Sequence, residues 1–152
     1  MLKHKISSKI SSMAKRRLLF IIGEHLSGKS KGVQDYLEER FGDSWKNHYI
    51  DMGLFLQKEL SQEQIDTYSM FPQEFEYDSV KLVSQLINNK QEDLLVIDHC
   101  DWLFAEDQTE WLKILMSETE VNRTIIVIVP EEYSELVPTH SYSMIYWGGG
   151  SQ

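Results

Sequence analysis

Short runs of apolar residues recur along this sequence, and most of them carry no polar residue on either face. The clearest runs are 18–22, 94–97 and 125–129, which read LLFII, LLVI and IIVIV. A strand with consecutive apolar residues is typical of a parallel sheet that helices cover on both faces. Two weaker runs, 48–52 and 143–147, predict a second and a fifth strand. Together the runs predict a mostly parallel sheet of about five strands.

The segments between these runs differ in how clearly they predict helices. Residues 31–41 have helical spacing and are followed by Gly42, a residue type that commonly ends helices. Residues 77–88 form a second amphipathic segment, and a third helix is expected after Thr109, which can cap it. Residues 54–72 are ambiguous, and we expect a short helix there and an irregular segment that Pro72 closes.

Buried strands that alternate with amphipathic helices are typical of an α/β sandwich. We therefore predict a three-layer α/β fold over residues 16–147, in which helices flank a mostly parallel sheet of about five strands. Residues 1–15 are a basic leader, and residues 148–152 are a Gly-rich tail. Sheets of this kind bind ligands beyond the carboxyl ends of their strands, which is where Gly23 and Asp98 both fall.

The loop after the first strand has the pattern of a phosphate-binding loop, or P-loop. It consists of Gly23, Glu24, His25, Leu26, Ser27, Gly28, Lys29 and Ser30. Glycines at its two ends allow a tight turn that aims backbone N–H groups at phosphates, and the helix that follows adds its positive dipole end. Lys29 is expected to reach the β- and γ-phosphates, and the Ser30 hydroxyl to bind Mg²⁺. The pattern predicts a P-loop NTPase fold that binds ATP or another NTP with Mg²⁺.

A second acidic element is expected in P-loop enzymes, and Asp98 has the right context for it. Asp98 directly follows the apolar run 94–97. A carboxylate at the end of such a strand holds Mg²⁺, directly or through water. We therefore predict Ser30 and Asp98 as metal ligands, and Lys29, Asp98 and Asp101 as catalytic residues.

The residue after Asp98 is His99, where many P-loop ATPases have a glutamate that activates water. Asp101 is the nearest carboxylate, and it either polarises water or caps the turn before Trp102. His99 is either a base or a packed, partly exposed histidine. The sequence leaves both alternatives open.

Arginines that could clamp phosphates are scarce, since none lies between Arg40 and Arg123. Arg123 precedes its strand, so we expect it at the sheet edge opposite the phosphate site, in a structural role. The sequence ends soon after the fifth strand, so no C-terminal helical domain is expected to close over a nucleotide. A neighbouring subunit could supply both closure and an arginine, either Arg123 or Arg16 and Arg17 of the leader. We predict slow hydrolysis by an isolated subunit and function within a homo-oligomer or complex.

Charge is distributed unevenly along the chain. The net charge is −9, but residues 1–17 hold six cations and no acid, which leaves nine cations against 24 acids elsewhere. A body this acidic repels a phosphate backbone, so nucleic acid is expected only indirectly or through the leader. We expect the leader to be a short solvated tail with an amphipathic turn. The alternatives are contact with nucleic acid, with an acidic partner or with the protein's own body.

The compartment follows from what the sequence lacks. A single cysteine, Cys100, excludes an intrachain disulfide and fits a reducing compartment. No apolar run approaches the roughly 18 residues of a membrane span, and no apolar signal-peptide core follows the basic start. We predict a soluble, cytoplasmic protein without membrane contact. The five histidines lack metal-ligand spacing, so a structural zinc is not expected.

Three stretches behind the phosphate loop carry a more specific signal. They are 94–104 (LLVIDHCDWLF), 122–130 (NRTIIVIVP) and 138–142 (PTHSY), the last with its histidine, His140. In this order they resemble BrxF, the family of small P-loop proteins in BREX bacteriophage-exclusion systems. The resemblance implies nucleotide binding at Gly23–Ser30 and Asp98, and a role in phage defence alongside other BREX proteins. Two departures are the leader and the residues after Pro130, where Glu131-Glu132-Tyr133 replaces Gly-rich and Trp residues of the family pattern.

Three functions are compatible with the sequence. The first is an ATP-binding, slowly hydrolysing subunit of an anti-phage defence complex. The second is a nucleotide-gated interaction module that barely hydrolyses ATP, which the missing glutamate favours. The third is a small-molecule kinase, which the scarcity of arginines disfavours.

Overall fold

The computed structural model describes all residues except 25, 107–108, 122, 139–141 and 149–152. Five strands form one sheet: β1 (Leu18–Gly23), β2 (Tyr49–Asp51), β3 (Leu94–Asp98), β4 (Thr124–Pro130) and β5 (Ser143–Trp147). Their order is β2-β3-β4-β1-β5, and every neighbouring pair is parallel. All five predicted strands are therefore confirmed, within a residue or two of their expected bounds.

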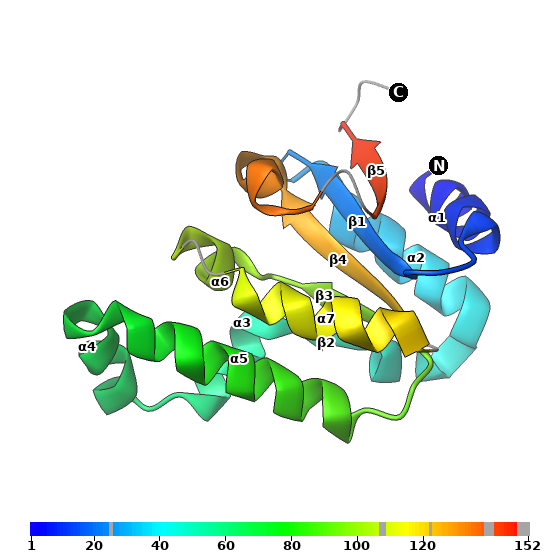
Figure 1. Cartoon of the computed structure of the whole chain (residues 1–152). Helices are drawn as coiled ribbons and strands as arrows, with labels where there is room; N and C mark the ends of the chain where they lie inside the picture. The colour runs from blue at the N-terminus through cyan, green and yellow to red at the C-terminus, as the bar shows by residue number, and fades with distance from the viewer. Residues whose placement is uncertain (25, 107–108, 122, 139–141, 149–152) are drawn as a thin grey trace.

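Helices cover both faces of this sheet (Figure 1). They are α1 (Leu2–Ser12), α2 (Lys29–Phe41), α3 (Met52–Glu59), α4 (Gln62–Met70), α5 (Pro72–Asn89), α6 (Asp101–Ala105) and α7 (Glu110–Val121). Two 3₁₀ helices, η1 (Gly42–His48) and η2 (Glu131–Leu136), complete the described elements. The predicted three-layer α/β architecture is confirmed, with an all-parallel sheet.

Alternate residues of each central strand point to opposite faces of the sheet, which divides the core in two. In β1, Leu18, Phe20 and Ile22 pack on the side that α5, α6 and α7 cover. Leu19 and Ile21 pack on the side that α1 and α2 cover. All positions of β1, β3 and β4 are buried, because helices cover both faces.

The segment that the sequence left ambiguous forms two helices, so the expected irregular stretch is wrong. The Asp51 carboxylate accepts a hydrogen bond from the Leu54 N–H and caps the start of α3. Ser61 and Gln64 form a reciprocal capping box that starts α4. Pro72, expected to close the irregular stretch, instead occupies the first turn of α5, where a missing N–H costs nothing.

The leader is also ordered, which corrects the expectation of a solvated tail. Leu2, Ile6 and Ile10 recur every four residues and are buried against the rest of the protein. Leu2 lies over Gly32 of α2 so closely that a Cβ on Gly32 would meet its side chain at 2.7 Å. Helix α1 therefore belongs to the second helical layer, beside α2.

No helix in the described part of the chain is both long and apolar enough to cross a membrane.

Candidate nucleotide site

The loop over residues 23–30 joins the end of β1 to the start of α2, as the motif requires. It lies at the edge of the sheet where the parallel strands end. A cleft of about 640 Å³ opens beside it. Its lining comes from the loop and the start of α2, from α3, from the ends of β3 and β4, and from the segment after β3: Leu26, Ser27, Gly28, Lys29, Ser30, Lys31, Gly53, Gln57, Asp98, His99, Asp101, Trp102, Ile128 and Pro130.

The backbone of the loop takes left-handed conformations at two positions. Gly28, the N-cap of α2, has φ 89°, a value that glycine adopts without steric cost. Leu26 has φ 60° and is 92% exposed at the tip of the loop. The first N–H groups of a helix have no intrahelical acceptor, and the N-cap Gly28 has no side chain to cap them, so they can meet an anion. His25, a predicted loop residue, lies outside the described residues.

The Lys29 side chain is buried within the loop that it follows. Its Nζ donates hydrogen bonds to the carbonyls of Gly23 (2.7 Å) and Glu24 (2.6 Å). Burial lowers the pKa of the Lys29 ammonium, while the nearby carboxylates, Asp98 first and then Asp101, oppose this shift. The carbonyls that accept from Nζ are neutral, so phosphate oxygens would give the buried ammonium an anionic partner. The environment of Lys29 therefore favours an anionic ligand.

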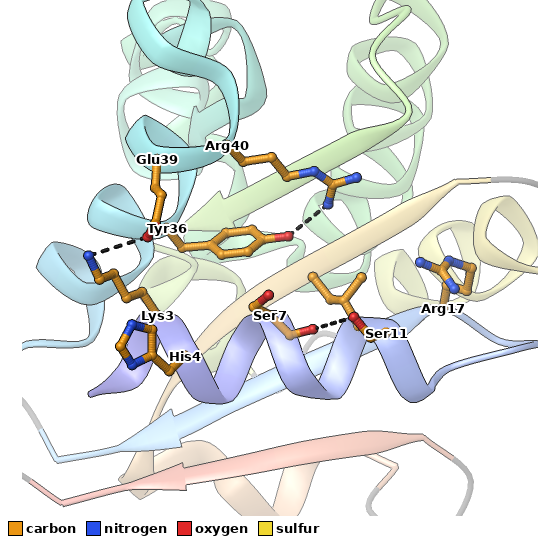
Figure 2. Close-up of a pocket in the computed structure, with 9 residues that line it drawn as sticks. Lys3, His4, Ser7, Ser11, Arg17, Tyr36, Glu39 and Arg40 are labelled. Carbon is orange, nitrogen blue, oxygen red and sulfur yellow. Dashed lines mark hydrogen bonds and ion pairs between the residues drawn. The ribbon is translucent and has the colours of Figure 1, made fainter.

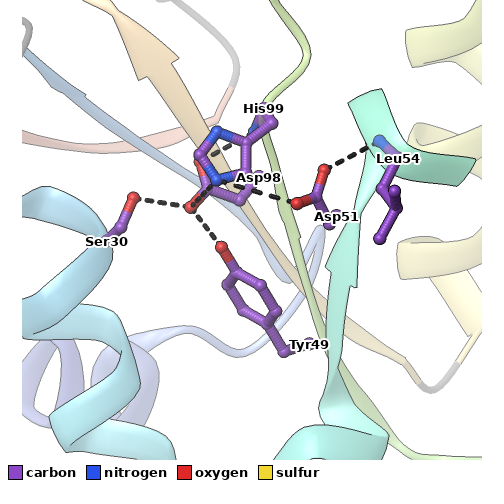
Figure 3. A network of polar contacts seen from close by, with 6 residues as sticks. All are labelled: Ser30, Tyr49, Asp51, Leu54, Asp98 and His99. Atoms are coloured by element: carbon purple, nitrogen blue, oxygen red, sulfur yellow. Dashed lines mark hydrogen bonds and ion pairs between the residues drawn. The ribbon is translucent and has the colours of Figure 1, made fainter. Parts of the chain in front are cut away.

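Ser30 and Asp98 meet across the cleft (Figure 3), although 68 residues separate them in the chain. The Ser30 hydroxyl donates to Asp98 Oδ2 at 2.6 Å, and Asp98 is buried. The Tyr49 hydroxyl donates to the same oxygen at 2.6 Å, and the His99 backbone N–H donates to Oδ1 at 2.7 Å. Burial and the hydrogen bond to Asp98 raise the pKa of Tyr49, which keeps its proton on the phenol. Three donors thus fix the orientation of one carboxylate.

This arrangement suits Mg²⁺ better than a metal held by protein ligands alone. In the described residues, no group of three or more His, Cys, Asp or Glu side chains could hold a metal ion. Magnesium is commonly bound through one or two carboxylates together with phosphate oxygens and water. Ser30 and Asp98 fit such a partial ligand set beside the loop over residues 23–30.

His99 lies half-exposed at the rim of the cleft, a position that fits both alternatives drawn from the sequence. Its backbone has φ 58°, which turns the chain sharply after β3. Its Nε2 lies 3.7 Å from Asp98 Oδ2 and 4.0 Å from Asp51 Oδ2 (Figure 3). The ring therefore stands between two carboxylates at the ends of neighbouring strands.

Asp101 is the first residue of α6 and lines the cleft. The N-cap of this helix is Cys100, and no side chain caps it, so the turn-capping alternative for Asp101 is not what the structure has. Its carboxylate is exposed and makes no hydrogen bond or ion pair with a described residue. It is available to a ligand or to water in the cleft.

The arginines lie far from this cleft within one chain. Arg123 donates to the carbonyls of Ile87 (2.8 Å) and Lys90, and it pairs with Glu118 (3.4 Å). These contacts give it the structural role that its position predicted. Arg17 precedes β1, at the opposite end of the strand from the loop.

Two residues that hold the site were missed in the sequence. Tyr49 begins the weak second strand, and nothing local marks its hydroxyl as a partner of Asp98. Trp147 ends β5, and its indole Nε1 donates to the Ser27 carbonyl at 3.1 Å. The Trp147 carbonyl lies so close to Gly23 that a Cβ there would be 2.1 Å away, which explains this glycine by packing as well as by loop geometry.

Comparison with known proteins adds no further evidence on family. No protein-family model, curated protein or solved structure matches this chain. The resemblance to BrxF therefore depends on the quoted motifs alone. Of these, Asn122 and most of the 138–142 stretch, including His140, lie outside the described residues.

Proposed function

We propose that this protein binds ATP, or another nucleoside triphosphate, together with Mg²⁺ in the cleft beside residues 23–30. One observation carries the proposal: the Ser30 hydroxyl and the Asp98 carboxylate lie 2.6 Å apart, next to a loop that buries Lys29. A hydroxyl and a carboxylate in this place are the protein ligands that a nucleotide-bound Mg²⁺ uses.

Each residue would have a distinct role toward the nucleotide. The uncapped N-terminus of α2 and the Lys29 ammonium would bind phosphate oxygens. Ser30 and Asp98 would hold Mg²⁺, which neutralises phosphate charge when it is bound. Tyr49 and the His99 N–H orient Asp98 without touching the ligand.

We propose that hydrolysis by the isolated chain is slow. Its Arg17 and Arg123 are held by neutral groups of the fold or by Glu118, away from the cleft. Asp101 is the one carboxylate of the cleft lining that makes no hydrogen bond or ion pair with a described residue, and it is our candidate for polarising water. An arginine that reaches the transferred phosphate accelerates such reactions by about 10³–10⁵. If no arginine reaches the site, the protein binds nucleotide and barely hydrolyses it. It would then act as a nucleotide-gated interaction module, the second function that the sequence allows.

The biological context that we propose is a cytoplasmic anti-phage complex of the BREX type. The support for it is the sequence resemblance of 94–104, 122–130 and 138–142 to BrxF. Partners within such a complex would then complete the catalytic site.

Calorimetric titration with ATP and Mg²⁺ tests the nucleotide site. Lys29→Ala should weaken ATP binding at least about 100-fold, because it removes the one side-chain cation within the loop. Lys113→Ala is the matched control: it removes an exposed ammonium that pairs with Glu110 on the surface of α7, outside the cleft lining. Equal affinity of wild type and Lys29→Ala would disprove the assignment.

The metal site is tested separately. Ser30→Ala and Asp98→Ala should shift the Mg²⁺ dependence of nucleotide binding to higher concentration, while Ser69→Ala, which removes an exposed hydroxyl of α4, should leave it at the wild-type value. Magnesium titrations that match wild type for both variants would remove Ser30 and Asp98 from the metal site and leave the phosphate site standing.

A further inference from the structure

A polar groove runs between α1 and the C-terminal half of α2 (Figure 2). It has a volume of about 490 Å³ and is lined by Lys3, His4, Ser7, Ile10, Ser11, Arg17, Tyr36, Glu39 and Arg40. None of these residues lines the cleft beside residues 23–30. Arg40 is eleven residues after Lys29 on the same helix, about 16 Å along its axis. The groove is therefore a separate site.

The two guanidinium groups in the groove are held by neutral partners. Arg17 Nε donates to the Thr124 hydroxyl at 2.7 Å, and its Nη1 donates to the Met13 carbonyl. Arg40 Nη1 donates to the Tyr36 hydroxyl at 2.7 Å. Among the described residues, neither arginine forms an ion pair with a carboxylate. Their positions are fixed while their charge is not neutralised.

The remaining lining adds donors and a single acid. Lys3 pairs with Glu39 at 3.3 Å, and the Glu39 side chain is largely exposed. Ser7 and Ser11 place two hydroxyl groups on the wall that α1 forms, and the Ser11 hydroxyl donates to the Ser7 carbonyl at 2.9 Å (Figure 2). Exposed Lys5, Lys15 and Arg16 lie on the same leader, so the positive charge extends beyond the groove. This concentration stands out in a chain whose net charge is −9.

We propose that this groove binds the phosphodiester backbone of a polynucleotide. Fixed arginines, lysine and hydroxyl groups are the side chains that bind phosphate oxygens in protein–nucleic acid complexes. The core of a protein–protein interface is commonly apolar, whereas this groove is lined mostly by polar side chains. Tyr36 is buried and accepts from Arg40, so its ring is not open to a base, and we expect the contacts of the groove to be mainly with the phosphate backbone.

This inference does not depend on the proposed nucleotide site. Fluorescence anisotropy with labelled 20-nucleotide single-stranded DNA, duplex DNA and RNA, at salt concentrations from 50 to 200 mM, measures it directly. Wild type should bind at least one of these probes, with an affinity that falls as salt rises. The order of the three affinities identifies the form of backbone that the groove accepts.

The decisive variant is Lys3→Ala/Arg40→Ala, which removes two of the cations. Affinity at 50 mM salt should fall about 100-fold, roughly tenfold for each charge-assisted contact. The slope of log affinity against log salt should shrink by about two. The control Lys58→Ala/Lys81→Ala removes two exposed cations from α3 and α5 and should change neither quantity. Arg40→Lys, which keeps the charge, should retain most of the binding, and circular dichroism confirms that each variant is folded.

Several results would overturn the proposal. They are no binding of any probe by wild type at 50 mM salt, or equal binding by wild type and the Lys3/Arg40 double variant. Displacement of the probe by polyglutamate as readily as by unlabelled oligonucleotide would assign the groove to an acidic protein instead. Displacement by excess Mg²⁺–ATP would place the polynucleotide at residues 23–30.

Discussion

The indole Nε1 of Trp147 donates a hydrogen bond of 3.1 Å to the backbone carbonyl of Ser27. The two residues are 120 positions apart in the chain, at the end of β5 and in the middle of the loop over residues 23–30. On its other side, the Trp147 ring faces the Lys5 ammonium of α1 at 5.3 Å. The last strand of the sheet therefore connects the leader helix to the loop that we assign to phosphate binding.

Replacing this tryptophan tests whether the contact shapes the loop. Trp147→Phe keeps an aromatic ring but removes the indole N–H. The Ser27 carbonyl then loses its hydrogen-bond donor, and this bond no longer ties the loop to β5. We expect nucleotide affinity to fall by about fivefold to tenfold, the value of one hydrogen bond, with little loss of fold stability. Trp45→Phe, far from the loop in η1, serves as control. Calorimetry that gives identical ATP affinities for Trp147→Phe and wild type would show that the contact is passive.

Tyr49 offers a second test, because another tyrosine makes the same kind of bond elsewhere. Tyr49 and Tyr68 each donate to a carboxylate, Asp98 at 2.6 Å and Asp78 at 2.7 Å. Tyr49→Phe should raise the Mg²⁺ concentration needed for nucleotide binding by about tenfold, since partners that orient a metal ligand commonly contribute 10- to 100-fold. Tyr68→Phe should leave the magnesium titration unchanged. A matching shift in both variants would mean that the effect is one of general stability.

Features of this protein that depend on neighbouring residues were predictable from the sequence, and features that depend on distant contacts were not. The strands were predictable because successive residues such as Leu19 and Phe20, which point to opposite faces of the sheet, are both apolar. The loop was predictable because its pattern lies within eight consecutive residues. Tyr49 and Trp147 were not, since their roles depend on tertiary contacts with residues far along the chain. In α1, the four-residue spacing of Leu2, Ile6 and Ile10 was present, but the six cations of residues 1–17 obscured it.

Helix α1 should contribute to the stability of the whole domain, in contrast to a solvated tail. Ile6 is fully buried, so Ile6→Ala should lower the free energy of unfolding by about 2–4 kcal/mol. Ser8 is exposed on the same helix, and Ser8→Ala should change it by less than about 0.5 kcal/mol. Urea denaturation measures both values. An Ile6→Ala variant as stable as wild type would mean that α1 does not stay docked in solution.

Gly23 should be intolerant of any side chain. A Cβ at this position would lie 2.1 Å from the Trp147 carbonyl, and backbone on both sides of the contact leaves little room to shift. Gly23→Ala should therefore destabilise the fold by about 2–3 kcal/mol. At Gly53, inside α3, the nearest atom would be 3.4 Å away, so Gly53→Ala should be neutral or stabilise by up to about 1 kcal/mol. Equal midpoints in thermal denaturation of the two variants would contradict the packing argument.

The last prediction concerns catalysis, and it follows from where the four arginines lie. Arg17 and Arg123 are bound to the fold, and Arg40 lines the groove between α1 and α2. Arg16 is exposed and has φ 53°, and its guanidinium makes no hydrogen bond or ion pair with a described residue. Since Arg16 precedes β1, at the opposite end of the strand from the cleft, it can serve only the cleft of a neighbouring copy.

We therefore expect ATP turnover per chain to rise with protein concentration, as copies associate in the presence of Mg²⁺–ATP. Arg16→Ala should remove this rise, at a cost of up to about 10³-fold if Arg16 acts on the transferred phosphate. Lys15→Ala, which removes the neighbouring exposed cation, should keep it. Sedimentation with Mg²⁺–ATP separates loss of assembly from loss of chemistry in these variants. A strictly monomeric protein that already turns over faster than about 1 s⁻¹, at a rate independent of concentration, would contradict the prediction, because unaided sites of this type run orders of magnitude slower.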